Sequence, residues 1–176
     1  VRTFPARRNS LRKEFSKNWK AKASIGYSHV LHSETIMSLN ERTKQLLKHY
    51  RVFPKKRLGQ NFMVDEGCLQ ALASYAFLNK NDVVLEIGAG LGALTKVLSP
   101  LCKEIIAVEV DRKLAEVLRI ELADLSNVTL IEGDILETEV PAFNKVVSNP
   151  PFHVSSPVLF WALQQNFECA VLTFQE

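Results

Sequence analysis

Apolar residues in this chain gather into short continuous runs that alternate with segments of helical periodicity. The runs have the length of strands and lie at 83–87, 105–110, 128–131, 145–148 and 170–174. Apolar positions at helical spacing lie between them, around 94–98 and over 112–123 and 157–165. Strands that are apolar throughout and separated by helices are typical of a parallel sheet covered on both faces. The pattern therefore predicts an α/β fold, a parallel sheet flanked by helices.

The segment before the first predicted strand does not continue this alternation of apolar runs and helices. Residues 39–50 predict a short polar helix, and 53–62 predict a basic loop interrupted by proline and glycine. Asp65 is expected to cap a helix that runs to about Phe77. The predicted domains are a basic extension at 1–36, a helix and basic loop at 37–64, and a core at 65–176. Because the chain ends just after the fifth strand, we expect the sheet to be incomplete at its C-terminal end.

The net charge of +3 is unevenly distributed. Residues 1–36 hold eight Lys and Arg against two Glu, which leaves fourteen basic and seventeen acidic residues, a net of −3, in the remainder. The basic character therefore belongs to the extension and does not indicate that the core binds nucleic acid. For the extension, three alternatives stay open: a stretch that is disordered or foreign to the domain, a targeting segment, and an RNA-binding tail.

Composition excludes some classes of protein. No apolar run approaches the length that spans a bilayer, so we expect no membrane partner. Cys68, Cys102 and Cys169 lie far apart, with no CxxC pair and no histidine at metal-ligand spacing. They predict thiols of a cytoplasmic protein rather than disulfides or a metal site.

The turn after the first predicted strand is rich in glycine: Glu86-Ile87-Gly88-Ala89-Gly90-Leu91-Gly92-Ala93. Glycines at such a turn let a ligand approach the backbone at the N-terminus of the next helix. The spacing of Gly88 and Gly90 also fits the dinucleotide pattern. The glycines alone do not distinguish a nicotinamide cofactor from S-adenosylmethionine, or either of these from a tight turn without a ligand.

Three acidic residues follow or end predicted strands. Glu86 suits a cofactor that carries an ammonium and a sulfonium, and would repel a pyrophosphate. Glu109 is placed to accept hydrogen bonds from ribose hydroxyls, and Asp134 from an adenine amino group. Carboxyl ends of parallel strands are where open α/β sheets bind ligands. Each acid singly is equally well explained as a helix cap or a solvated turn residue.

Asn149-Pro150-Pro151-Phe152 follows the fourth predicted strand. The Asn149 side-chain oxygen and the Pro150 carbonyl are acceptors of the kind that an adenine N6 amine requires. Phe152 can stack on a base taken out of its helix. The alternative is an Asn-Pro turn with a phenylalanine in the core.

Taken in order, these motifs resemble the Rossmann-like, class I amino-methyltransferases of the N6-adenine type. Upstream, Arg57-Leu58-Gly59-Gln60-Asn61-Phe62-Met63-Val64-Asp65 is similar to the signature of small-subunit ribosomal RNA adenine N6-dimethyltransferases and the related erythromycin-resistance methylases. The similarity runs from about Val52 to the end of the chain. Pro150 and Phe152 depart from the family, which usually has Leu or Ile and Tyr at these positions.

The resemblance implies dimethylation of adenosine N6 in small-subunit ribosomal RNA, with S-adenosylmethionine as cofactor and the small-subunit precursor particle as partner of a monomer. The cofactor-binding residues that the resemblance and the strand-end pattern together predict are Asn61, Met63, Glu86, Gly88, Gly90, Glu109, Asp134 and Asn149. The predicted catalytic residues are Asn149, Pro150 and Phe152. Lys55, Lys56 and Arg57 are candidates for RNA phosphates, with a solvated loop as the alternative.

Three other functions compete with this interpretation. A protein-glutamine methyltransferase also uses Asn-Pro-Pro-aromatic to hold an amide nitrogen, although the Gln60-Asn61-Phe62 stretch favours the RNA enzymes. A non-catalytic ribosome-assembly or transcription factor on the same fold would keep RNA binding alone. A nicotinamide dehydrogenase explains neither Glu86 nor the motif that starts at Asn149.

Overall fold

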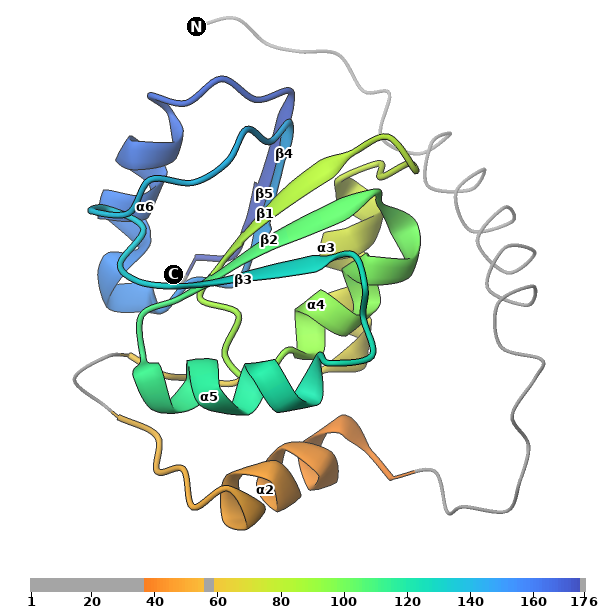
Figure 1. Ribbon diagram of the computed structural model, residues 1–176, viewed down its shortest axis with the longest axis vertical. Coiled ribbons are helices and arrows are strands. Elements are labelled where there is room, and N and C mark those ends of the chain that lie inside the picture. Colours follow the sequence, from red (N-terminus) through yellow and green to blue (C-terminus); the bar gives the residue numbers. More distant parts are fainter. Residues whose placement is uncertain (1–36, 56–58, 175–176) are drawn as a thin grey trace, which may run out of the picture. The chain divides into compact units, whose positions relative to one another are not determined.

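A computed structural model describes residues 37–55 and 59–174 of the chain (Figure 1). The predictions for the extension at 1–36, Lys56 and Arg57 lie outside the described residues. Five parallel strands form one sheet in the order β3-β2-β1-β4-β5. The strands are β1 (Val83–Ile87), β2 (Glu104–Glu109), β3 (Val128–Glu132), β4 (Lys145–Ser148) and β5 (Cys169–Leu172).

Helices precede and connect the strands. They are α2 (Leu39–His49), α3 (Glu66–Tyr75), α4 (Ala93–Leu98), α5 (Arg112–Glu121) and α6 (Ser155–Ala162), with short 3₁₀ helices η2 (Ser99–Leu101) and η3 (Phe152–Val154). As predicted, Asp65 caps α3, its carboxylate accepting from the Cys68 N–H at 3.0 Å. No helix among the described residues is both long and apolar enough to cross a membrane.

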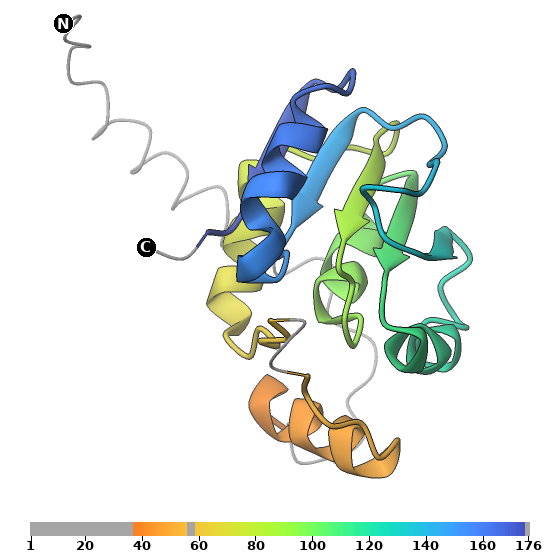
Figure 2. The same cartoon turned by 90° about the vertical axis from the view of Figure 1, so that its left-hand side faces the viewer.

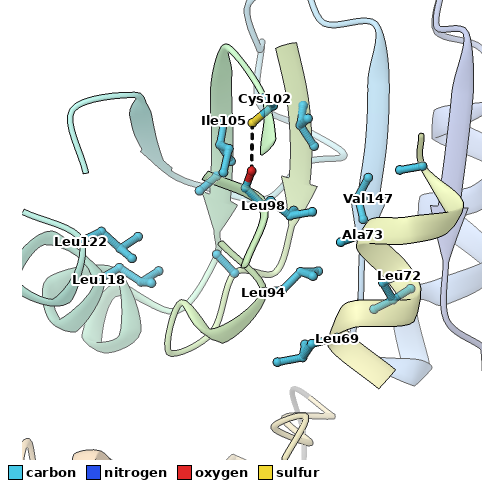
Figure 3. Packing of buried hydrophobic residues seen from close by; sticks show 14 residues of the cluster. Leu69, Leu72, Ala73, Leu94, Leu98, Cys102, Ile105, Leu118, Leu122 and Val147 are labelled. Carbon is cyan, nitrogen blue, oxygen red and sulfur yellow. Dashed lines mark hydrogen bonds between the residues drawn. The ribbon is translucent and has the colours of Figure 1, made fainter. Parts of the chain in front are cut away.

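Alternate residues of a strand point to opposite faces of the sheet. The central strands β1, β2 and β4 are buried on both faces, whereas the edge strands β3 and β5 are only partly buried. One face packs against α3, α4 and α5, and Figure 3 shows leucines of these three helices gathered around strand residues Ile105 and Val147. Cys102 lies in the same layer and donates from Sγ to the Leu98 carbonyl. The other face packs against α6 and the segment that precedes β4, through residues such as Val158 and Phe143. The three-layer α/β fold that the pattern predicted is therefore confirmed.

Helix α2 lies beyond the ends of the strands toward which their arrowheads point (Figure 2). It rests on α5 through an apolar cluster that includes Leu46, Leu114 and Val117. Glu121 at the end of α5 reinforces the contact, since it accepts from the Tyr50 hydroxyl at 3.0 Å. The carboxyl edge of the sheet is thus partly covered by α2.

The strand order reverses between β1 and β4, and there the two strands separate. Their register pairs only Val84 with Lys145 and Leu85 with Val146. Farther along, the fully buried Ser148 replaces the backbone ladder: its hydroxyl donates to the Ile87 carbonyl and accepts from the Ile87 N–H. A crevice at such a switch point is the usual ligand site of an open α/β sheet.

Candidate functional site

A cleft opens at this switch point, at the carboxyl edge of the sheet. Its walls come from the loops that follow β1, β2 and β4, from residues 59–63, and from Thr43 of α2. The sequence-predicted residues that line it are Asn61, Met63, Glu86, Gly88, Gly90, Glu109, Asn149, Pro150 and Phe152. Segments far apart in the sequence therefore place most of the predicted site residues in one cleft.

The glycine loop forms the floor of the cleft in a conformation that favours glycine. Gly88 and Gly90 have φ angles of +74° and +63°. A Cβ on Gly88 would lie 3.2 Å from the Pro151 ring, so the loop after β4 packs directly on this backbone. The Gly88 N–H donates to the Val108 carbonyl at 2.8 Å, which ties the loop to β2. Because Gly88 has no side chain, the loop after β1 and the loop after β4 can pack closely together.

Glu86 brings a buried acid to the cleft. Its side chain leaves β1 on the α4 side, where only 2% of the residue is exposed. Burial raises the pKa of Glu86 to about 8, Thr95 opposes this, and the charge of Glu109 adds to it. Thr95 lies beside the carboxyl, and among the described residues Oε2 of Glu86 has no hydrogen-bond partner. A buried carboxyl oxygen without a donor is costly, and a cationic ligand in the cleft would supply one.

Glu109 ends β2 and is also buried, with 4% exposed. Its Oε2 accepts from the Gly90 N–H at 2.8 Å and its Oε1 from the Asp111 N–H at 2.9 Å. Burial raises the pKa of this carboxyl, while the two backbone N–H groups lower it. Each oxygen keeps a lone pair for a further donor, such as a ribose hydroxyl.

Asp111 anchors the segment that bears Asn61 and Met63. Its Oδ2 accepts from the Gln60 side-chain amide at 2.8 Å and pairs with the Lys55 ammonium at 2.8 Å. These hydrogen bonds hold the pKa of Asp111 below its usual range, against the effect of burial. Lys55, a candidate for RNA phosphates, is therefore already paired with a carboxylate.

Asn149 follows β4 and its side chain also meets β5. Its Oδ1 accepts a hydrogen bond from the Thr173 hydroxyl. Next to it Pro150 is buried, and among the described residues no donor is bonded to the Pro150 carbonyl. Phe152 begins η3 at the wall of the cleft. The motif thus places an amide, a free carbonyl and an aromatic ring together.

Asp134 is not among the residues that line the cleft. It lies beyond β3 in an exposed turn, where its Oδ1 accepts from the Leu136 N–H at 3.0 Å. This contact is the turn role that the sequence left open as the alternative. Acceptance from an adenine amino group stays a prediction for Asp134.

Sequence reasoning missed several residues that build the cleft. Thr43, Gln60, Thr95, Asp111 and Thr173 each line it or hold a lining residue. A signal existed for Asp111, because an Asp directly before a predicted helix is a common N-cap. The other four are ordinary polar residues whose partners become apparent only in the folded chain.

Comparison with known proteins bears on this cleft. The family described as ribosomal RNA adenine dimethylase matches residues 53–176, about seven tenths of the chain. The chain belongs to this family. Its fold and its motifs are therefore those of a methyltransferase family, as the resemblance implied.

Two similar curated proteins come from archaea. A probable ribosomal RNA small subunit methyltransferase A of Pyrococcus abyssi is 42% identical over 137 residues, which are 78% of this chain and 51% of that protein. Its counterpart in Thermococcus onnurineus is 44% identical over 137 residues, 78% of this chain and 50% of the relative. The chain thus spans about half the length of the curated relatives it matches.

Solved structures give the same picture. A dimethyladenosine transferase from Plasmodium falciparum has a TM-score of 0.59 and 34% identity, covering 64% of this chain and 42% of that one. The 23S rRNA methyltransferase ErmE has a TM-score of 0.62 and 30% identity, covering 65% of this chain and 48% of that one. The first is a dimethyladenosine transferase and the second a ribosomal RNA methyltransferase by name, and both share this part of the fold.

Proposed function

We propose that this chain is the cofactor-binding part of an S-adenosylmethionine-dependent enzyme that dimethylates adenosine N6 in small-subunit ribosomal RNA. The observation that carries the proposal is the meeting of two buried acids and the Asn149 motif in one cleft. Family membership supports the reaction, and the names of the archaeal relatives support the small-subunit substrate. The activity of the whole protein is part of the proposal, because the chain spans only half of those relatives.

The residues of the cleft fit S-adenosylmethionine. That cofactor supplies a methyl group on a sulfonium sulfur, and it also carries an ammonium. Oε2 of Glu86, buried without a partner among the described residues, suits a positive group. The free lone pairs of Glu109 suit ribose hydroxyls, and the open backbone of Gly88 allows close approach. A pyrophosphate would instead be repelled by Glu86, which disfavours a nicotinamide cofactor.

The chain's own groups act on the amine mainly by orientation. The Asn149 amide oxygen and the Pro150 carbonyl accept its two N–H groups and turn its lone pair toward the methyl group. Phe152 stacks on the base, and its ring performs this without the phenol hydroxyl of the usual tyrosine. The leaving thioether needs no acid, so no proton donor has to stand opposite the amine. The nitrogen that gains the methyl group becomes positively charged and then loses one N–H proton to water.

The test is transfer of labelled methyl from S-adenosylmethionine to undermethylated small ribosomal subunits, with the protein at its full natural length. We expect the label in N6,N6-dimethyladenosine. In the cell, the proposed enzyme acts as a monomer in the cytoplasm on the precursor particle. Label on a peptide amide but not on RNA would instead identify a protein-glutamine enzyme. Cofactor binding without any transfer would identify a non-catalytic assembly factor.

Replacing Asn149 by alanine should lower the rate of transfer by a factor of 100 or more, roughly the effect of losing one preorganised group at a reacting centre. Cofactor affinity should stay within about tenfold, because the lost contact acts mainly in the transition state. Asn166→Ala is a matched control, since Asn166 is exposed in the loop before β5. Equal losses of rate and cofactor affinity in Asn149→Ala would contradict the role of Asn149.

A further inference from the structure

Thr173 links the end of β5 to the C-terminal end of β4, where Asn149 follows. It is the first residue after β5, and its hydroxyl donates to Oδ1 of Asn149. Its backbone N–H donates to the Ser148 carbonyl at 3.3 Å, in continuation of the sheet ladder. Thr173 therefore attaches to both residues at the end of β4, once through its backbone and once through its side chain.

In the structure the hydroxyl contact is made to the oxygen end of the Asn149 amide. An asparagine side chain rotates about two bonds, and its oxygen and nitrogen ends are nearly equal in shape. Asn149 is only half-buried, so packing alone does not fix its rotation. Among the described residues Thr173 is the side-chain hydrogen-bond partner of this amide. Without this hydrogen bond the NH2 end of the Asn149 amide could face the target amine. Two donor groups would then point at each other and repel.

We propose that Thr173 is a positioning residue, whose hydroxyl holds the Asn149 amide so that its oxygen faces the target amine. The inference rests on the proposed function of Asn149. The oxygen has two lone pairs: one accepts from Thr173 and the other is left for the amine. Ser148 supplies the matching anchor on the β1 side through its bonds to Ile87. The Asn149 loop is thus held from both neighbouring strands.

Valine and serine separate this role from a structural one. Thr173→Val keeps the branched shape and the backbone bond to Ser148 but removes the hydroxyl, whereas Thr173→Ser keeps the hydroxyl. Loss of one hydrogen bond of ordinary net strength corresponds to about a fivefold decrease in kcat. In the full-length protein we expect that decrease in Thr173→Val, with the KM for S-adenosylmethionine within about twofold of wild type. Thr173→Ser should recover wild-type kcat within about twofold.

A second measurement follows the amide itself and needs no activity. In a nuclear magnetic resonance spectrum with labelled asparagine, the Asn149 side-chain signal is the one missing from Asn149→Ala. It should shift in Thr173→Val and stay near its wild-type position in Thr173→Ser. Thr129→Val is the control, because Thr129 lies on β3, the edge strand far from β5, where its hydroxyl bonds to Glu104 of β2.

The outcomes are distinct. A fall in kcat that serine restores, together with the shifted amide signal, supports the positioning role. An unchanged kcat in Thr173→Val, a serine variant as slow as the valine variant, or an unmoved amide signal overturns it. If wild-type protein methylates no RNA, the proposed function fails, and the amide signal still decides whether Thr173 orients Asn149.

Discussion

Replacing Glu86 by glutamine should remove most of the pH dependence of cofactor binding. Burial raises the pKa of this carboxyl to about 8, so below that pH the free protein holds it mainly neutral. A cation placed beside the buried Oε2 favours the carboxylate and lowers the pKa of Glu86 in the complex. Binding of S-adenosylmethionine must then release the proton.

The size of the effect follows from the pKa of the free carboxyl. The pKa of Glu86 in the free protein is about 8, so the fraction of free protein with an ionised Glu86 rises about twentyfold from pH 6.0 to 7.5. In the complex the carboxyl is taken as ionised throughout this range. Affinity should rise by the same factor, because the ionised form is the one that binds the cation. At pH 7 about 0.9 proton should leave for each cofactor bound.

Calorimetry in two buffers with different ionisation enthalpies measures that proton directly. In Glu86→Gln we expect weaker binding at pH 7.5, a nearly flat affinity over the same pH range, and no Glu86 proton released. Glu116→Gln is the matched control, because Glu116 is exposed on α5 and pairs only with Arg112 and Lys113 among the described residues. S-adenosylhomocysteine, which lacks the sulfonium charge, should show a smaller pH dependence than S-adenosylmethionine. Equal proton release from wild type and Glu86→Gln would refute the reasoning.

Three further substitutions test other parts of the fold. Ser148→Ala should lower the free energy of unfolding by about 2 kcal/mol in urea denaturation, because it leaves buried backbone groups of Ile87 without partners; an unchanged midpoint would contradict this. Gly92→Ala should cost about 1–3 kcal/mol by the same measurement, since Gly92 has a φ of +79° and its new Cβ would lie 2.9 Å from Leu122. Asp111→Asn should raise the KM for S-adenosylmethionine several-fold with kcat nearly unchanged, because the carboxylate that anchors the loop of Asn61 is weakened; a fall in kcat alone would argue against anchoring.

The strands were predictable because each is a continuous apolar run. The predicted limits of β1 and β4 match the structure. Strand β2 lies one residue earlier than predicted, β3 ends one residue later, and β5 begins one residue and ends two residues earlier. Helix α6 was placed less well, since it begins at Ser155 rather than at Pro157. Proline is accepted anywhere in the first turn, where backbone N–H groups have no partners in the helix. The position of Pro157 therefore marks the start of a helix only approximately.

The meeting of Glu86, Glu109 and Asn149 was predictable for a related reason. Parallel strands end at one edge of the sheet, so residues at their carboxyl ends converge whatever the details of packing. Asp134 also follows a strand, but it does not line the cleft, and its carboxylate accepts from the Leu136 N–H in the turn after β3. The contact of Thr173 with Asn149 depends on the register of β5 against β4, which apolar runs do not specify.

The ladder between β1 and β4 is the shortest in the sheet. Strands β1 and β2 pair along their whole length, whereas β1 and β4 pair at only two positions before they part. The two buried acids lie on β1 and β2 and Asn149 follows β4, so this short ladder lies between the proposed sites of the methyl donor and its acceptor. The proposed path of the methyl group therefore crosses the sheet where neighbouring strands share the fewest paired residues.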